Sequence, residues 1–519
     1  MHRILLLRNR DEPDIISHLG KSIHRFLRYR SNRHASMASE RKAVLIFIRP
    51  MLSSMHMADY PDFQTTEEGR AFENEIMQIL SGEKKDYPNY FGGLKIASGH
   101  EFNIYSPIDP TIQYGIFQDP EEGTMEEAVT AAVKAFEKWS VMPVEERARY
   151  FQAIPGVLKA RRLHYAAAIT VSSGMVREDA LAEVDATIEA IEKILADAKE
   201  LGRKRPWGVW AVITAHNSPF ASPIAHAVAA MVAGNTVVMN PSKHCPMPAH
   251  LFYNLMEKYD LPGGVLNLIV DRKEYTTEAL ANDMRVAGLV ASGSGERLED
   301  LMFLQVDDEM KFINEIKGMN PAVVYRPSDM KATVRNIMES AFAYSGQRLY
   351  SCSKVIITRE DQQKFVDLLA EYMKDLKIDD PVNDTSFTGP VICQDYADGY
   401  KAKALELMPF TIAKAMPVSK DLPENYVAPI AVCGLDEEDD LNYMDSGFPI
   451  LNVFVVDSVD KIFEELENTE CGLSAGAFSK DPKFLDRFEK DVDVPQKYIN
   501  CSSRALRPAK TAVLSNFVR

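Results

Sequence analysis

The chain is short of positive charge, and this shortage limits the partners that it can bind. It has 59 Lys and Arg residues against 75 Asp and Glu residues, so its formal net charge at pH 7 is −16. Nucleic acids and anionic membrane surfaces attract proteins of the opposite charge. We therefore expect neither of them to be the main partner of this chain.

Paired cysteines and long apolar runs are also missing. The six cysteines lie singly, without a C-x-x-C pair. This scatter favours reduced thiols in a cytoplasmic protein over a disulfide framework or a zinc site. His244 and Cys245 are adjacent, but no second pair at ligand spacing accompanies them, so we predict no metal site. The most apolar stretch, residues 218–239, is interrupted by polar residues and predicts a buried helix followed by a buried strand.

Residues 1–56 differ in composition from the rest of the chain. They are rich in Arg and show no periodic core pattern, and they lack the apolar segment and cleavage site of a signal peptide. Their Arg and Ser content allows a mitochondrial presequence, and thus a matrix location, although Asp11, Glu12 and Asp14 count against it. We favour an upstream start, with the protein beginning near Met57 and residues 1–56 disordered or not native.

The rest of the chain predicts two α/β domains, since 519 residues are too many for one core. Strand and helix patterns alternate over residues 205–296, which is typical of a parallel sheet with crossover helices. We assign residues 57–316 to a Rossmann-type domain with N-terminal helices. A second alternating series, with the strands PAVVY, KVIIT and ILNVFVV, assigns residues 317–496 to another α/β domain. Residues 497–519 form a C-terminal tail.

Three short motifs carry candidate chemistry. Glu315 opens the segment E-I-K-G-M-N-P, and a Ser-Gly-Gln turn centred on Gly346 follows about thirty residues later. The third motif, A-H-N-S-P, contains Asn217 and follows a predicted strand. Together they resemble the active-site core of the aldehyde dehydrogenase superfamily, in its 1-pyrroline-5-carboxylate dehydrogenase-like branch. The resemblance spans about residues 100–500. It implies the fold of that family, with a Rossmann-type domain, an α/β catalytic domain and an oligomerisation element.

The resemblance also implies a mechanism. In the family a cysteine thiolate attacks the aldehyde, an amide stabilises the oxyanion, and a glutamate activates water to hydrolyse the thioester. Asn217 and Glu315 occupy the amide and glutamate positions. The position of the nucleophile is Leu349, which has no ionisable atom. Cys352 lies three residues further on, roughly 10 Å along an extended chain. It is a candidate substitute nucleophile, although we favour a packed structural residue.

The implied cofactor, NAD or NADP, has lost two of its family contacts. Asn240 stands where the family has a lysine that binds the adenosine ribose, and Asn425 stands where a glutamate holds the nicotinamide ribose. Ser242 and Lys243 are the nearest replacements, and Lys243 is suited to a 2′-phosphate. We therefore expect the binding of NAD(P) by domain 57–316 to be weak or lost.

A small-residue turn could still accept a phosphate of the cofactor. Gly293, Ser294 and Glu296 lie where a predicted strand passes into a helix, and they match the G-S-x-E turn of the family. A helix N-terminus with small residues is suited to a phosphate group.

The oligomerisation element is predicted to be reduced. Residues 202–208 leave too little chain for the protruding β-hairpin of the family, and the P-F-G-G-W segment expected after Asn500 is missing. Residues 514–519 do resemble the terminal strand of the family. We expect a homodimer, or a hetero-oligomer with an active paralogue.

Two functions follow from these motifs. The first is an aldehyde-dehydrogenase-like protein without thiol-dependent oxidation, which acts as a structural or regulatory partner. The alternative is an active NAD(P)-dependent oxidoreductase of a small aldehyde or semialdehyde. It would use Cys352 as the nucleophile, or a non-covalent reaction at Glu315 and Asn217.

Overall fold

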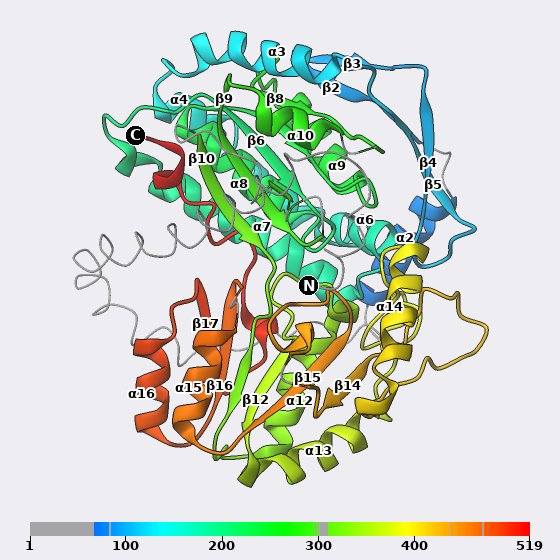
Figure 1. Ribbon diagram of the computed structural model, residues 1–519. Coiled ribbons are helices and arrows are strands. Elements are labelled where there is room, and N and C mark those ends of the chain that lie inside the picture. Colours follow the sequence, from blue (N-terminus) through cyan, green and yellow to red (C-terminus); the bar gives the residue numbers. More distant parts are fainter. Residues whose placement is uncertain are drawn as a thin grey trace, which may run out of the picture. The chain divides into compact units, whose positions relative to one another are not determined.

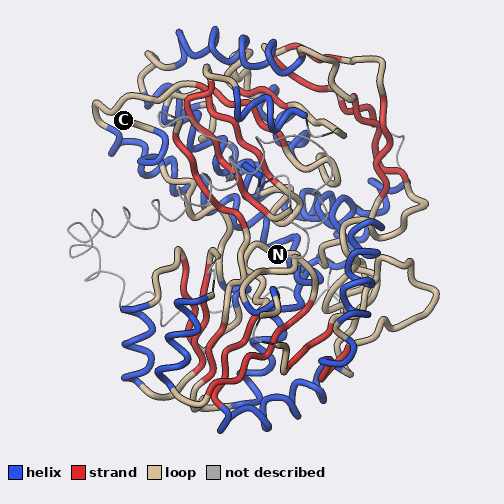
Figure 2. Tube along the Cα trace, viewed as in Figure 1, coloured by secondary structure: helices blue, strands red, loops and turns tan. Residues whose placement is uncertain are grey.

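The computed structural model describes most of the chain after residue 66 (Figures 1 and 2). The described residues are 67–81, 85–273, 275–295, 298, 300–301, 310–436, 438–469 and 472–519. The predicted N-terminal extension, residues 1–56, lies outside them, as does Glu296. The predictions made for these residues therefore stay predictions.

The first sheet has seven strands in the order β10-β9-β6-β7-β8-β2-β3. The first five are parallel, and the last two are antiparallel. Their bounds are β2 Asn89–Phe91, β3 Leu94–Ile96, β6 Val209–Thr214, β7 Thr236–Asn240, β8 Leu266–Leu268, β9 Val286–Gly293 and β10 Lys311–Ile316. Strands β6 and β7 are buried at every position because helices cover both faces of the sheet.

The two faces of this sheet are covered by different helices (Figure 1). Along β6, the side chains of Trp210 and Val212 pack with helices α8 (Ala221–Ala233) and α9 (Met247–Lys258). The alternate residues Ala211 and Ile213 pack with α3 (Thr124–Trp139) and α10 (Tyr275–Asn282). This alternation is the period-2 geometry of a strand between two helical layers.

A smaller sheet and several helices precede the Rossmann-type strands. The sheet has the order β1-β5-β4, with β1 Lys85–Tyr87, β4 Glu101–Tyr105 and β5 Gln113–Gln118. The helices are α2 Glu67–Ser81, α4 Val144–Arg149, α5 Ile154–Ala160, α6 Arg162–Ser173 and α7 Arg177–Asp197. Eleven residues of α7 are buried, among them two acids, Asp179 and Glu183. This helix therefore brings carboxylates into the interior.

The second sheet also has seven strands, in the order β13-β14-β15-β12-β11-β16-β17. All are parallel except β13 at one edge. Their bounds are β11 Ala322–Val324, β12 Lys354–Thr358, β13 Thr411–Lys414, β14 Ile430–Cys433, β15 Ile450–Val456, β16 Ser474–Phe478 and β17 Gln496–Ile499. Helices α12 (Met330–Phe342) and α13 (Arg359–Met373) cover one face, and α15 (Val459–Asn468) and α16 (Pro482–Asp491) cover the other. The two parallel sheets confirm the predicted α/β class with a Rossmann-type sheet.

The chain passes from the first sheet to the second between Ile316 and Ala322. The last residues then return to the first part of the chain. Phe517 packs on Trp210 with ring centroids 4.5 Å apart. Arg519 and Arg205 exchange two backbone hydrogen bonds, of 2.8 and 3.1 Å. The terminal residues thus pair within their own chain.

Residues 202–208 are all described and connect η1 (Ala198–Leu201) directly to β6. They contain no strand, so no hairpin protrudes between these two elements. None of the helices in the described part of the chain combines the length and apolar character needed to cross a membrane.

Candidate functional site

Residues 344–347, here called the Gly346 turn, hold an unusual backbone. Tyr344, Ser345 and Gly346 have φ angles of 52°, 51° and 72° in succession. Non-glycine residues adopt such values at a cost and need support from their surroundings. The backbone N–H and the hydroxyl of Ser345 donate to Thr388 Oγ1 and the Gly389 carbonyl, at 2.6 and 2.7 Å. The turn is therefore fixed, and it determines where the next two residues point.

Leu349 follows this turn and is almost fully buried, with 2% of its surface exposed. It forms a small apolar cluster with Tyr350 and Leu473, and Leu506 packs against it. Its carbonyl accepts a hydrogen bond of 2.8 Å from the side chain of Asn320. The loop is held firmly, but the side chain that it presents cannot act as a nucleophile.

Asn217 joins two of the predicted motifs. Its Nδ2 donates to the Gln347 carbonyl at 2.7 Å and to Ser294 Oγ at 3.0 Å. Its Oδ1 accepts the backbone N–H of Ser294 at 2.8 Å. The structure therefore places Asn217 beside the Gly346 turn, but both hydrogens of the amide are already used. They would have to leave these partners to stabilise an oxyanion.

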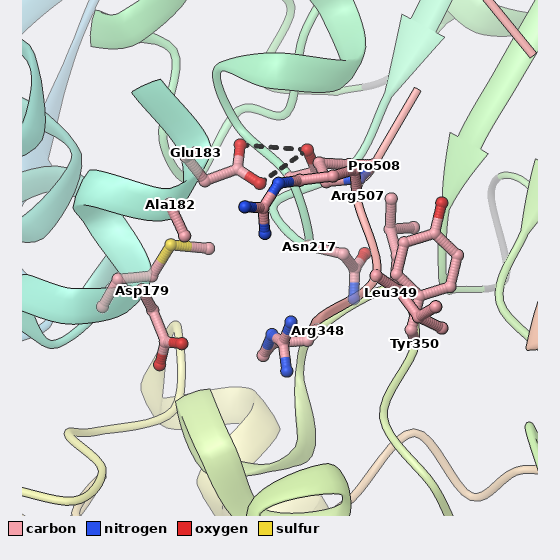
Figure 3. Close-up of a pocket in the computed structure, with 12 residues that line it drawn as sticks. Asp179, Ala182, Glu183, Asn217, Arg348, Leu349, Tyr350, Arg507 and Pro508 are labelled. Atoms are coloured by element: carbon pink, nitrogen blue, oxygen red, sulfur yellow. Dashed lines mark hydrogen bonds between the residues drawn. The ribbon is translucent and has the colours of Figure 1, made fainter. Parts of the chain in front are cut away.

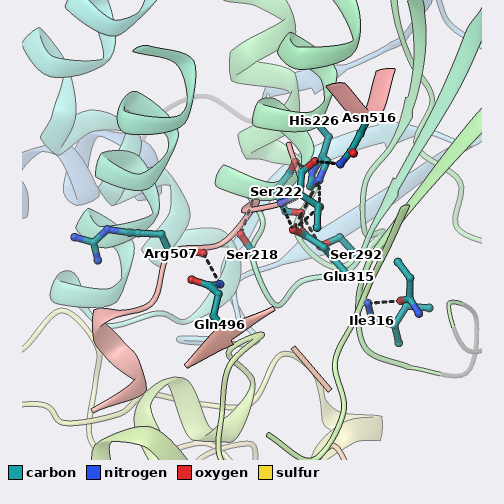
Figure 4. A network of polar contacts seen from close by, with 11 residues as sticks. Ser218, Ser222, His226, Ser292, Glu315, Ile316, Gln496, Arg507 and Asn516 are labelled. Atoms are coloured by element: carbon teal, nitrogen blue, oxygen red, sulfur yellow. Dashed lines mark hydrogen bonds and ion pairs between the residues drawn. The ribbon is translucent and has the colours of Figure 1, made fainter. Parts of the chain in front are cut away.

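Glu315 lies in a closed network of donors (Figure 4). It pairs with Ser292 in the register of β10 and β9, and it is 1% exposed. Ser222 Oγ and Ser292 Oγ lie 3.3 and 3.2 Å from Oε2 and 2.6 Å from each other. One of the two hydroxyl hydrogens joins the serines, and the other is donated to Oε2. Oε1 accepts from the Thr511 hydroxyl at 2.7 Å and from the Thr511 N–H at 3.2 Å. Both oxygens are thus engaged, which leaves little capacity to bind and activate a water.

A small cavity of about 30 Å³ lies in front of Leu349 (Figure 3). This is the space of roughly one water molecule, far below the 300–1,000 Å³ of ordinary ligand pockets. Its wall includes Asp179, Glu183, Asn217, Arg348, Leu349 and Leu506. Among the described residues, neither Glu315 nor Cys352 belongs to this wall. The structure brings Asn217 and Leu349 to one cavity and places the other two catalytic candidates outside it.

Four charged residues that line this cavity, Asp179, Glu183, Arg348 and Arg507, were not predicted from the sequence. Glu183 accepts from Ser218 Oγ and from the backbone N–H of Ala221, both at 2.9 Å, and burial raises its pKa to about 7. Burial lowers the pKa of Arg348, whose Nη1 has no hydrogen-bond partner among the described residues. Glu183 stands at an inward position of α7, so helical periodicity was the only sequence signal that it gave.

Cys352 lies in the core of the second sheet. It is 1% exposed, and its Sγ donates to the Lys354 carbonyl at 3.2 Å. Burial raises the pKa of the thiol to about 12, so it stays protonated at neutral pH. A nucleophilic cysteine normally has a lowered pKa and access to substrate.

The sequence matches the model of one protein family over most of its length. The family model described as the aldehyde dehydrogenase family matches residues 95–511, which is most of the chain. The chain belongs to the aldehyde dehydrogenase family. This confirms the predicted family and fold.

Curated relatives come from the same group. The chain is 25% identical over 467 residues to 1-pyrroline-5-carboxylate dehydrogenase of Geobacillus sp. (strain WCH70), covering 85% of this chain and 89% of the relative. It is 26% identical over 446 residues to malonate-semialdehyde dehydrogenase of Bacillus cereus (strain G9842), covering 81% and 91%.

A solved structure of Thermus 1-pyrroline-5-carboxylate dehydrogenase with bound NAD has the same fold. It matches with a TM-score of 0.81 at 19% identity, covering 88% of this chain and 96% of that one. Betaine aldehyde dehydrogenase from Staphylococcus aureus, in complex with NAD⁺, gives a TM-score of 0.78 at 20% identity, covering 83% and 90%. Relatives of this aldehyde dehydrogenase family member thus bind a nicotinamide cofactor.

Asn240 and Asn425, which the family resemblance predicts at the two ribose positions, both have hydrogen-bond partners within the chain. Asn240 donates to the Ile269 carbonyl at 2.8 Å and accepts from Thr277 Oγ1 at 3.2 Å, and it is 1% exposed. Asn425 is also buried, and its Nδ2 donates to the carbonyls of Pro107 and Val391. Both amides tie segments of the protein together. The Asn240 amide has partners for both its nitrogen and its oxygen, whereas Asn425 Oδ1 is buried without a hydrogen-bond partner among the described residues.

The remaining cofactor candidates lie in turns. Ser242 is buried and accepts the N–H of His244, whereas Lys243 is partly exposed. Gly293 approaches its neighbours too closely for any side chain, since an added Cβ would lie 2.4 Å from the Cβ of Ala215. Ser294 is engaged with Asn217 through its N–H. The requirement for glycine at 293 is thus explained by packing within the chain.

A buried ion pair stands close to the Glu315 motif of this family member. Lys317 Nζ bonds to Asp445 Oδ2, and the two side chains are 1% and 7% exposed. Asp445 Oδ1, Tyr396 Oη and His216 Nε2 are buried and have no hydrogen-bond partner among the described residues. Burial, with the His244 and Lys317 charges, lowers the pKa of His216 to about 3, so this ring is neutral. Within the described ranges, no group of His, Cys, Asp or Glu side chains is placed to hold a metal ion.

Proposed function

We propose that this aldehyde dehydrogenase family member does not carry out thiol-dependent aldehyde oxidation, and that it acts as a structural or regulatory partner of an active paralogue. The observation that carries the proposal is Leu349. It lies at the end of a rigid turn, at the position that the family resemblance assigns to the nucleophile, and no other described side chain in the cavity offers a thiol. Covalent catalysis in the family depends on that atom.

The neighbouring groups support the same proposal. The Asn217 amide and the Glu315 carboxylate, which would serve as oxyanion donor and base, are both saturated by internal hydrogen bonds. Cys352 is a protonated core residue, which disfavours it as a substitute nucleophile. An active oxidoreductase of a small aldehyde or semialdehyde would require these groups to rearrange.

Weak cofactor binding belongs to the same proposal. Two charged ribose anchors of the family are replaced by amides with internal partners. Each lost charge-assisted hydrogen bond is worth roughly 1.5–3 kcal/mol, so the two together lower affinity on the order of a hundredfold or more. Calorimetric titration should give weak or no binding of both NAD and NADP. A low-micromolar dissociation constant for NAD or for NADP would contradict the proposal of weak cofactor binding.

The central test measures aldehyde-dependent NADH formation with the parent protein, Leu349→Cys and the size control Leu349→Ala. The semialdehydes named for the curated relatives, and short simple aldehydes, are the substrates. We expect no turnover from the parent or Leu349→Ala. We expect a covalent adduct from Leu349→Cys, with NAD-linked turnover well below roughly 1 per second. Parent turnover within the usual range of roughly 1–10³ per second would refute the proposal.

A partner role also predicts the assembly. The short connection from η1 to β6 leaves no arm to pair subunits in the manner of the family. Light scattering of the isolated chain should show at most a homodimer, and co-expression with an active paralogue should give a mixed complex. A homotetramer paired through an extended arm would contradict the reduced oligomerisation element.

A further inference from the structure

We propose that residues 506–511, here called the C-terminal segment, plug the Leu349 cavity, and that Glu315 holds this plug in place through Thr511. The Glu315 carboxylate would then hold the chain's own C-terminal segment against the cavity by hydrogen bonds. This inference concerns access to the cavity and holds whether or not any aldehyde is oxidised.

The segment forms one wall of the cavity. Arg507 and Pro508 line it (Figure 3). Leu506 lines it too, and packs against the cluster of Leu349 and Tyr350. The space left in front of Leu349 holds roughly one water. Access to position 349 therefore depends on where this segment lies.

Thr511 fixes the segment at its far end. Its hydroxyl and its N–H both bond to Glu315 Oε1, and its hydroxyl also lies 2.8 Å from His226 Nε2. Asn516 supports the residue from behind by donating to its carbonyl at 2.8 Å. If Thr511 leaves, Oε2 of Glu315 still has Ser222 and Ser292. The carboxylate would stay in place while the segment moves.

Both flanks of the segment are anchored, so movement is confined to the residues between them. On one side, Arg504 is partly buried and pairs with Glu178 and Asp179 of α7 at 2.8 and 3.2 Å. On the other side, Phe517 packs on Trp210. Between these anchors Ala509 has a φ angle of 58°, a left-handed value that strains the backbone of a non-glycine residue. Opening of the segment releases this strain, whereas closure is favoured by Thr511.

The test uses a cysteine as a probe of access. In a Leu349→Cys background, Thr511→Val removes the hydroxyl that bonds to Glu315, whereas Thr511→Ser retains it. Ser515→Ala changes an exposed residue of the same tail and serves as the control. The rate of alkylation of the new thiol by N-ethylmaleimide is measured by tandem mass spectrometry. Cys352, on the same peptide, reports any general loosening of the fold.

We expect Thr511→Val to raise the alkylation rate at position 349 on the order of tenfold, because a hydrogen bond to a charged group is lost. Thr511→Ser and Ser515→Ala should stay within about twofold of the background, and the Cys352 rate should not change. The proposal is overturned if Thr511→Val also stays within about twofold, or if it accelerates both thiols equally.

A second measurement uses the unmodified chain and does not depend on any variant folding. Amide hydrogen exchange should be faster for residues 506–510 than for the flanking elements η5 (Ser503–Ala505) and η6 (Leu514–Phe517). Equal protection across all three would contradict a segment that opens locally. Neither experiment contains an aldehyde or NAD. Each can therefore contradict the role of the C-terminal segment without contradicting the proposed function, and the proposed function can fail without affecting either experiment.

Discussion

The Gly346 turn and the strand end that carries Glu315 differ in opposite ways in backbone and side chain. The turn keeps a strained backbone, supported by Thr388 and Gly389, yet it presents the inert side chain of Leu349. The strand end carries a carboxylate, but hydrogen bonds from the Ser222–Ser292 pair and from Thr511 engage both of its oxygens. One region has a rigid backbone with an unreactive side chain at its end, and the other has an ionisable group whose oxygens already have donors. Retention of a motif residue therefore shows little about activity until its partners are known.

The largest expected effect concerns the ion pair next to the Glu315 motif. Asp445→Ala leaves the Lys317 ammonium buried without its partner, which should lower the free energy of unfolding by about 3–5 kcal/mol. Denaturation by urea measures this change. The exposed pair of Arg359 and Asp457 is the matched control, and Asp457→Ala should cost at most about 1 kcal/mol. Equal losses in the two variants would mean that Lys317 is not confined as the structure shows.

A pH-dependent effect should follow from Glu183. Its pKa of about 7 in the folded protein exceeds the ordinary value of 4.5, because burial disfavours the charged form. The unfolded chain therefore loses this proton first as the pH rises from about 4.5 to 7. In this window the group lowers stability by up to about 1.4 kcal/mol per pH unit.

Glu183→Gln removes this contribution because glutamine does not titrate. The difference in unfolding free energy between the variant and the parent should shift in favour of the variant between pH 4.5 and 7. Below pH 4.5 and above pH 7, this difference in unfolding free energy should no longer change with pH. Parallel stability curves for the two proteins would show that Glu183 titrates normally, and that its charge is not confined beside Arg348.

The smallest effect tests the geometry of the turn. Gly346→Ala places a side chain at a φ angle of 72°, with its Cβ 3.0 Å from Pro449 Cα. Gly434→Ala is the control, since its φ of 78° is similar but no atom lies within 4 Å of the added Cβ. Each should lose about 1–2 kcal/mol from the left-handed backbone, and Gly346→Ala should lose more because of the contact. Equal unfolding free energies for the two variants would indicate a looser turn than the one described.

The sequence by itself determined the α/β class, the succession of strands and helices, and the family. Short apolar runs and period-3.6 patterns are local, and buried strands such as β6 and β7, with the helices between them, follow from these signals. The absence of a thiol at Leu349 was equally a property of the sequence, since no fold can supply a missing atom. The motifs of Asn217 and Gly346 were predicted to meet, and the structure brings them together through one hydrogen bond.

Only the tertiary structure decided how the retained groups are used. Thr511 lies 196 residues from Glu315, and Pro107 lies 318 residues from Asn425, so neither contact leaves a local pattern in the sequence. Whether a carboxylate or amide is free depends on donors and acceptors that the fold supplies from distant segments. Burial has the same origin, and it gives Glu183 and Cys352 their shifted pKa values. Residue types are local properties, whereas hydrogen-bond partners and desolvation depend on the whole fold.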